Sequence, residues 1–132
     1  MRIKREADYA IRCVSHLVQR PGEIAAIEDI SKGVRVPKDF VAKIMQKLSR
    51  AGIVKSHRGV RGGFELARAP ALISFLDIIE AVQPVEMNIC AIDDRRCSLS
   101  NSCAIHPAWV EIREEVRGIL AGRNFARLKP GR

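Results

Sequence analysis

The chain has 132 residues, of which 47% are hydrophobic, and a formal net charge of +8. This length fits one domain with an appended element. No apolar run reaches the roughly 18 to 20 residues of a membrane span. No apolar stretch typical of a signal peptide follows MRIKREADYA. We therefore expect a cytoplasmic protein without membrane contact, in which clustered cysteines are metal ligands or reactive thiols rather than disulfides.

The excess positive charge lies in the first half of the chain. Residues 1–68 contain fifteen Lys and Arg against seven Asp and Glu, a net charge of +8, whereas residues 69–132 contain eight of each kind. A one-sided basic region is typical of a nucleic-acid-binding surface. An anionic membrane fits less well, because no basic amphipathic helix with an aromatic face is present.

Three helices are predicted in the basic half. Residues 5–20 carry apolar side chains at helical spacing, and Pro21-Gly22 ends this first helix. Cys13, at the edge of its stripe, is expected to be buried rather than a ligand. A short second helix is predicted at residues 26–34, with Ile27 and Ile30 inward. A third is predicted at residues 37–52, with its apolar face formed by Phe40, Val41, Ile44, Met45 and Leu48.

The second and third predicted helices, with a turn at residues 34–36 between them, resemble a helix-turn-helix. The outward positions of the third helix are mostly polar or basic, namely Lys38, Asp39, Ala42, Lys43, Gln46 and Lys47. Such a face is equally typical of an ordinary amphipathic helix in solvent. The helix alone therefore does not establish DNA binding.

The segment after the third helix favours the DNA-binding interpretation. Residues 53–56 and 64–67 are predicted to be short strands, and the loop HRGVRGG joins them. Its glycines permit a slender, tight tip, and Arg58 and Arg61 are cations suited to a narrow minor groove. A phosphate-binding loop is excluded, because no helix opens directly after Gly63. A helix-turn-helix followed by this hairpin predicts a winged helix.

The second half contains two further predicted helices. A fourth at residues 73–84 has Phe75, Ile78, Ile79 and Val82 inward. A fifth at residues 107–122 has an apolar seam formed by Trp109, Ile112, Val116 and Ile119. Such a seam packs against another helix, either the first helix of the same chain or a second copy across a two-fold axis. The tail from residue 122 is expected to be loosely ordered.

Three of the four cysteines lie in NICAIDDRRCSLSNSC, residues 88–103. Six residues separate Cys90 from Cys97, five separate Cys97 from Cys103, and two separate Cys103 from His106. Three thiolates on one loop suit an iron–sulfur cluster, with histidine or a carboxylate as the remaining ligand. The same residues fit a zinc site of three cysteines and one histidine, and a metal-free thiol switch is a third interpretation.

An enzyme is a further alternative, since a cysteine and a histidine can act as nucleophile and base. No third orienting residue, oxyanion loop or cofactor motif accompanies them, and the basic half would have no role. We therefore do not expect catalysis.

Taken together, these motifs resemble the Rrf-two family of winged-helix bacterial transcription factors, of the IscR and NsrR type. The resemblance covers nearly the whole chain and rests on MRI with Asp8-Tyr9-Ala10, KIMQKLSRAGIV, RGVRGGFELAR, LDIIEAV and the spaced cysteines. It implies a homodimer with domain-exchanged long helices that binds a palindromic operator in double-stranded DNA. It also implies that a cluster on the cysteine loop changes DNA affinity. We expect a repressor that senses redox state, nitric oxide or iron–sulfur status.

The resemblance offers two candidates for the fourth cluster ligand. His106 suits a 2Fe-2S cluster, which we favour, whereas Asp8 of the partner subunit would suit a 4Fe-4S cluster. Each residue also has a purely structural interpretation. His106 would cap the helix opened by Pro107, and Asp8 would stabilise a helix N-terminus. Family members commonly have five or fewer residues between the first two cysteines, so the loop here is longer.

The predicted fold is mostly α, with a small β-hairpin wing and a long C-terminal dimerisation helix. Residues 1–83 form the winged helix-turn-helix domain, residues 84–106 the cluster-binding loop, and residues 107–132 the dimerisation helix and a flexible tail. The expected DNA contacts are Lys38, Asp39 and Lys43 in the major groove, Arg58 and Arg61 in the minor groove, and Arg2, Lys4 and Arg5 on the backbone.

Overall fold

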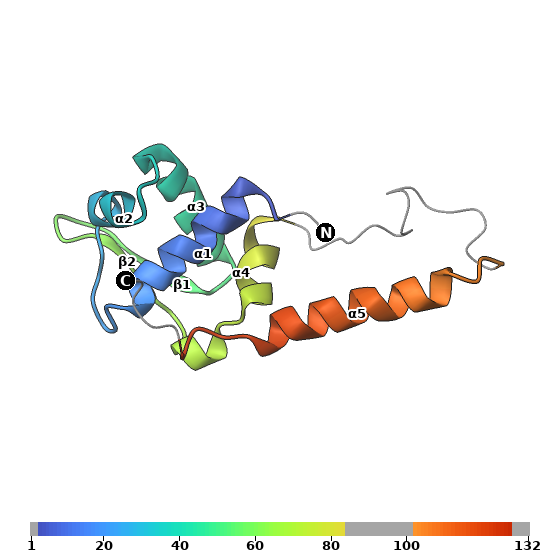
Figure 1. Ribbon diagram of the computed structural model, residues 1–132. Coiled ribbons are helices and arrows are strands. Elements are labelled where there is room, and N and C mark those ends of the chain that lie inside the picture. The colour runs from blue at the N-terminus through green and yellow to red at the C-terminus, as the bar shows by residue number, and fades with distance from the viewer. Residues whose placement is uncertain (1–2, 84–101, 128–132) are drawn as a thin grey trace.

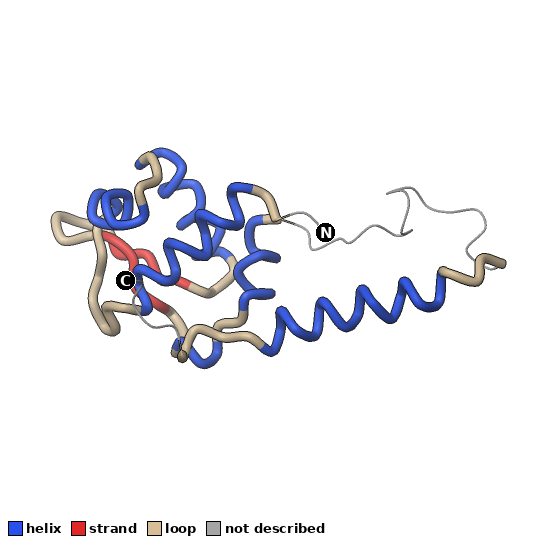
Figure 2. The backbone as a smooth tube through the Cα atoms, in the orientation of Figure 1, coloured by secondary structure: helices blue, strands red, loops and turns tan. Residues whose placement is uncertain are grey.

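The computed structural model of the chain describes residues 3–83 and 102–127. Its elements, in chain order, are α1 (Arg5–Val18), α2 (Ile27–Val34), α3 (Lys38–Arg50), β1 (Val54–His57), β2 (Gly63–Leu66), the 3-10 turn η1 (Pro70–Leu72), α4 (Phe75–Val82) and α5 (His106–Gly122). Helices α1 to α4 and the hairpin form one rounded unit, and α5 extends away from it as a rod (Figure 1, Figure 2). The predicted mostly α fold with a hairpin wing is confirmed, and the predicted elements match to within two residues.

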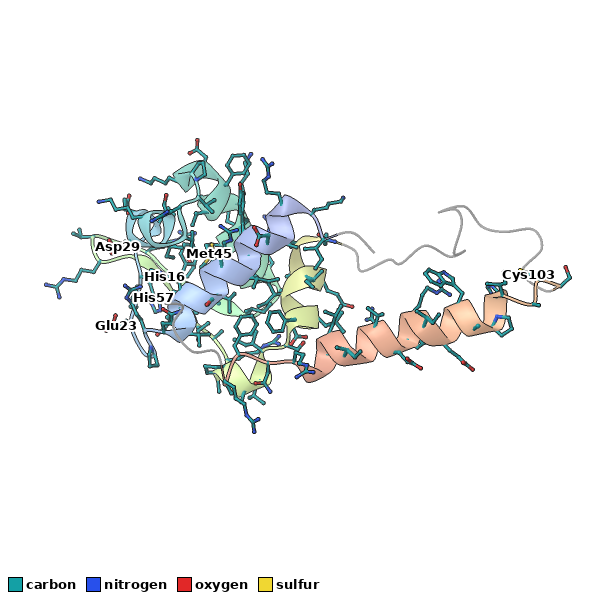
Figure 3. The ribbon with its side chains drawn as sticks, in the orientation of Figure 1. His16, Glu23, Asp29, Met45, His57 and Cys103 are labelled. Carbon is teal, nitrogen blue, oxygen red and sulfur yellow. The ribbon has the colours of Figure 1, made fainter. Side chains whose placement is uncertain are left out.

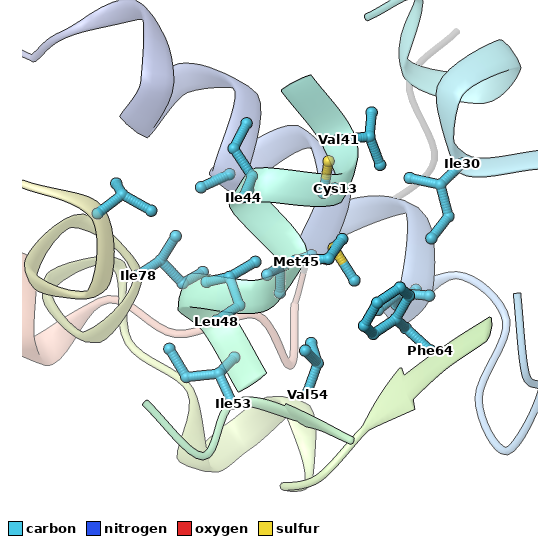
Figure 4. Close-up of a cluster of buried hydrophobic side chains, with 14 of the residues drawn as sticks. Cys13, Ile30, Val41, Ile44, Met45, Leu48, Ile53, Val54, Phe64 and Ile78 are labelled. Atoms are coloured by element: carbon cyan, nitrogen blue, oxygen red, sulfur yellow. The ribbon is translucent and has the colours of Figure 1, made fainter. Parts of the chain in front are cut away.

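The hydrophobic core lies where α1, α3, α4 and the hairpin meet. Helix α3 contributes its buried face, and Ile78 of α4, Ile53, and Val54 and Phe64 of the hairpin pack around it (Figure 4). Cys13 of α1 is fully buried here, as predicted. Burial raises the pKa of its thiol to about 12, so the thiol stays protonated at neutral pH and is a poor metal ligand.

A tight turn between α2 and α3 sets the direction of the third helix. Arg35 adopts a left-handed conformation, with φ 57° and ψ 47°, and the Ser31 hydroxyl donates to the Val36 carbonyl at 2.6 Å. Val36 is only 2% exposed and anchors the turn in the core. Pro37 is the N-cap rather than the predicted first helical residue, and α3 begins at Lys38.

The hairpin is attached to the loop before α2 as well as to the core. Strands β1 and β2 are antiparallel, with Ser56 opposite Phe64. Phe64 also exchanges two backbone hydrogen bonds with Ala25, at 2.8 and 2.9 Å. A Cβ atom at Gly63 would overlap the Ala25 carbonyl, so the two segments approach this closely only because residue 63 is glycine.

Helix α4 begins at a capping box and joins both ends of the chain. The Ser74 hydroxyl accepts from the Asp77 amide and the Asp77 carboxylate accepts from the Ser74 amide, each at 3.0 Å. At the end of α4, the Gln83 side chain accepts a hydrogen bond from the Lys4 amide at 2.8 Å.

No described helix combines the length and apolar character needed to cross a membrane.

The expectation of a loosely ordered tail is wrong at Phe125. Its ring is fully buried and lies 4.8 Å from the ring of Phe75, centroid to centroid. Asn124 forms a bridge with Ser74, and the Phe125 amide donates to the Pro70 carbonyl. The aromatic ring packs against η1 and α4, so the chain returns to the core after α5.

A second correction concerns Phe40, which was expected on the buried face of α3. Its side chain is 54% exposed, whereas Val41, Ile44, Met45 and Leu48 are buried. At about 100° per residue, Phe40 lies roughly 80° from the centre of that apolar stripe. An edge position can turn either way, and here the ring contacts Tyr9 rather than the core interior.

Candidate DNA-binding surface and cysteine segment

The outer face of α3 presents the three residues predicted for the major groove. Lys38, Asp39 and Lys43 are all exposed. Lys38 forms an ion pair with Glu28 of α2 at 2.5 Å. The hydrogen bond between them lowers the pKa of Glu28 and raises that of Lys38. Both side chains are in solvent, so this ion pair is weak and easily exchanged for a phosphate.

The loop of the hairpin presents the two arginines predicted for the minor groove. Arg58 and Arg61 are exposed on either side of Val60, whose side chain is fully in solvent. The loop projects from the unit at the end opposite the far tip of α5 (Figure 1). At its base, His57 and Glu65 form a half-buried contact at 2.7 Å, which links the two strands through their side chains.

The surface cations differ in whether an acid neutralises them. Among the described residues, Lys47 pairs with Glu6 at 2.5 Å, Arg12 with Asp8 at 3.0 Å, and Arg117 with Glu80 at 2.5 Å. Within the same residues, no acid or other polar partner is assigned to Lys43, Arg58 or Arg61. These three cations are therefore available to phosphate oxygens or base edges.

Two more exposed cations near these elements were missed by sequence reasoning. Arg35 lies in the turn before α3, and Lys55 lies on β1. Their positions in the sequence could have identified them as DNA contacts, because each residue directly flanks a predicted DNA-contacting element. At the N-terminus, Lys4 and Arg5 are exposed where α1 begins, while Arg2 lies outside the described residues.

The predicted cluster ligands are only partly within the described chain. Cys103 is a half-buried free thiol just before α5, and His106 is the first residue of that helix. The His106 amide donates to the Cys103 carbonyl at 3.2 Å, so the two residues occupy one turn. Cys90 and Cys97 lie outside the described residues. Within residues 3–83 and 102–127, no three side chains of His, Cys, Asp or Glu converge on one point.

Asp8 and Cys103 are not brought together within one chain. Asp8 lies on α1 in the rounded unit and pairs with Arg12. Cys103 lies at the tip of α5 that is farthest from that unit (Figure 3). An Asp8 ligand would therefore have to come from a partner subunit, as the resemblance implies.

Helix α5 leaves its predicted seam largely uncovered. Ile112 and Ile119 are 44% and 60% exposed, Trp109 and Val116 are half-buried, and no residue of α5 is fully buried. The helix meets the rest of the chain near its C-terminal end, where Leu120 packs on the core and Arg117 pairs with Glu80 of α4. Helix α1 does not cover the seam, so that alternative from the sequence is not realised.

Comparison with known proteins assigns the chain to a family. The family model Rrf2, described as an iron-dependent transcriptional regulator, matches residues 3–130. The chain belongs to the Rrf2 family. The chain is also 32% identical over 117 residues to a candidate HTH-type transcriptional regulator from Aquifex aeolicus. That match covers 86% of this chain and 81% of the relative.

Solved structures share the fold of this Rrf2 protein. CymR, the global cysteine regulator of B. subtilis, superposes with a TM-score of 0.74 at 23% identity, covering 95% of this chain and 93% of that one. The IscR structure from T. potens superposes with a TM-score of 0.71 at 20% identity, covering 99% and 94%. Family and fold together show a winged-helix, DNA-binding transcriptional regulator.

Proposed function

We propose that this Rrf2 protein is a homodimeric repressor that binds a palindromic operator, and that an iron–sulfur cluster on its cysteine segment sets its DNA affinity. The observation that carries the DNA-binding part is the set of exposed cations without acidic partners on α3 and the wing, Lys43, Arg58 and Arg61. They lie on the two elements that a winged helix uses to reach the grooves.

The docking of α3 and the wing follows from their shapes. The N-terminal residues of a recognition helix meet base edges in the major groove, which places Lys38, Asp39 and Lys43 there. The slender loop with Arg58 and Arg61 suits the narrower minor groove or its phosphates. Lys38 leaves Glu28 for the DNA on binding, since an exposed ion pair offers little resistance.

The chemistry of the donor set supports a cluster on the cysteine segment. Cys103 and His106 stand on one turn at the tip of α5, and Cys90 and Cys97 precede them in the same segment. Three thiolates with one imidazole suit a 2Fe-2S cluster, which would supply a centre sensitive to redox state, nitric oxide and iron supply. Cys13 is unsuited, because its thiol is buried and protonated.

Zinc and a metal-free thiol switch are the competing candidates. The same donors fit a structural zinc ion. A metal-free switch would need only the thiols of Cys90, Cys97 and Cys103, which oxidants can modify directly. The family description, an iron-dependent regulator, favours iron.

The position of the cysteine segment supports its control of DNA affinity. It joins α4, in the DNA-binding unit, to α5, whose exposed seam we assign to a second copy. Gain or loss of the cluster would change the conformational order of this segment. The relative placement of the two winged domains would change with it, and so would their fit to the two operator half-sites. A coupling of about 1 to 3 kcal/mol already corresponds to roughly 5- to 150-fold regulation.

The decisive experiment replaces Cys90, Cys97 and Cys103 by Ser in one variant. The native protein, purified anaerobically, should contain iron and sulfide by metal analysis and Mössbauer spectroscopy. Its affinity for an operator selected from random duplexes should change after exposure to nitric oxide or oxidant. The triple variant should bind that operator equally with and without exposure. Cys13→Ala, which removes a buried thiol, is the control and should respond like the native protein.

Three outcomes would overturn parts of this proposal. If the triple variant responds like the native protein, the cysteine segment is not the sensor. Colourless protein with stoichiometric zinc identifies the structural zinc site instead. Metal-free protein that still responds through these cysteines identifies a thiol switch.

A further inference from the structure

Phe40 stands out on the charged outer face of α3. It is the third residue of the helix, in its first turn, and about half of its side chain is in solvent. The other large apolar side chains of α3 are buried. Burial in the core therefore accounts for only about half of the surface of this residue, and the exposed half is available to a partner.

The ring is held in position from one side. Tyr9 of α1 contacts Phe40 edge to face, with the centroids 6.3 Å apart and the planes at 69°. Tyr9 is itself partly buried against the core. This contact restricts the Phe40 ring without covering it, so the ring is oriented before any partner arrives.

The surroundings of Phe40 identify the chemistry of its partner. Asp39 precedes it and Lys43 follows one turn later, and both are exposed and charged. The large hydrophobic side chains exposed elsewhere in the described chain lie on other elements, so Phe40 forms no extended apolar patch on α3. A single apolar group within a charged face matches the major groove, where the thymine methyl is the apolar feature among hydrogen-bonding groups.

We infer that Phe40 is a specificity-determining residue that contacts the 5-methyl group of a thymine in each operator half-site. The inference rests on the proposed DNA-binding function and extends it to one base. The ring lies in the first turn of the recognition helix, which is the part that meets base edges. Asp39 and Lys43 then read or position neighbouring groups by hydrogen bonds and charge.

The test replaces thymine by deoxyuridine, which pairs identically but lacks the methyl group. An operator is first selected from random duplexes with the native protein, and each of its thymines is then replaced singly. Fluorescence anisotropy should show one position per half-site at which the native protein loses about three- to fivefold in affinity, as expected for one buried methyl group. Phe40→Ala should bind the thymine duplex more weakly and should no longer distinguish thymine from deoxyuridine at that position.

Two further variants separate this role from a structural one. Lys43→Ala should weaken operator binding yet keep the thymine preference at that position, because Lys43 contacts other groups of the DNA than the thymine methyl. Phe40→Leu keeps an apolar side chain and should restore part of the preference. Circular dichroism of the Phe40→Ala variant should match the native protein, and thermal melting should show only a small loss, because half of the side chain and one ring contact are removed.

The failures of the two proposals are distinguishable. If no duplex is selected by the native protein, the proposed DNA-binding function fails. If a selected operator binds tightly but no deoxyuridine substitution weakens it, the inference about Phe40 fails alone. It fails also if Phe40→Ala keeps the native thymine preference.

Discussion

At the residue scale, the surface cations have different roles because their neighbours differ. Arg68 donates to the Ala51 carbonyl at 3.1 Å and approaches Asp77 at 3.7 Å, so it links the end of α3 to the start of α4. Arg58 has no such partner among the described residues and stands at the tip of the wing. Arg68 therefore supports the fold, and Arg58 is available to DNA.

We predict that Arg58→Ala weakens operator binding and lowers the slope of log affinity against log salt by about 1, because one phosphate or minor-groove contact is lost. Anisotropy titrations at several salt concentrations measure both effects. Arg123→Ala is the matched control, since it removes one exposed cation outside the helix-turn-helix and wing. Unchanged affinity of Arg58→Ala at moderate salt would rule out the wing as a DNA contact.

At the element scale, the hairpin owes its placement to backbone contacts with a distant loop. The Ala25–Phe64 pair adds a third segment beside β2, and Phe64 inserts its ring into the core. A two-stranded hairpin alone is at best marginally stable in water. These attachments hold the base of the wing against the helix-turn-helix while its tip stays slender.

We predict that Gly63→Ala destabilises the protein by about 1 to 3 kcal/mol, because the new methyl group overlaps the Ala25 carbonyl and breaks this pairing. Chemical denaturation measures the loss, and operator affinity should fall with it because the wing is displaced. Gly118→Ala is the matched control: its Cβ meets nothing within 4 Å, and alanine is the better helix former. A Gly63→Ala variant as stable as the native protein would contradict this account.

At the scale of the whole molecule, α5 is an element without a sufficient partner in its own chain. Seventeen residues form a rod of roughly 25 Å, and only its C-terminal end contacts the rounded unit. An exposed apolar seam of this length is unfavourable in water. A second copy would cover it by the two-fold contact that the proposed function requires.

We predict that Ile112→Asp converts the proposed dimer to a monomer or makes the chain insoluble, because it would bury an unpaired charge in the seam. Light scattering after size-exclusion chromatography measures the mass. Glu114→Gln also changes one charge on α5 but lies roughly 180° from the seam, so it should leave the dimer intact. A folded, dimeric Ile112→Asp variant would show that the seam is not the interface.

Local pattern in the sequence was sufficient to predict most elements and much of the candidate DNA-binding surface. The positions of α1 to α5 follow from apolar spacing, and the hairpin follows from two short apolar runs around a glycine-rich loop. The exposure of Lys43 follows from the same pattern, because a side chain opposite a buried stripe faces solvent, and the exposure of Arg58 and Arg61 follows from their place in the loop between the strands. The cysteine spacing indicates a ligand set, although Cys90 and Cys97 lie outside the described residues.

Tertiary structure decided the features that depend on contacts between distant residues. Phe40 lies at the edge of its stripe, and in the folded chain its ring contacts Tyr9 and stays half exposed. Phe125 is buried by its contacts with Phe75 and Pro70, which no periodic pattern in its own segment indicates. The seam of α5 was predicted, but only the packing of the other helices shows that α1 does not cover it. Periodicity identifies which face of an element is apolar, whereas the element that covers this face depends on how the whole chain packs.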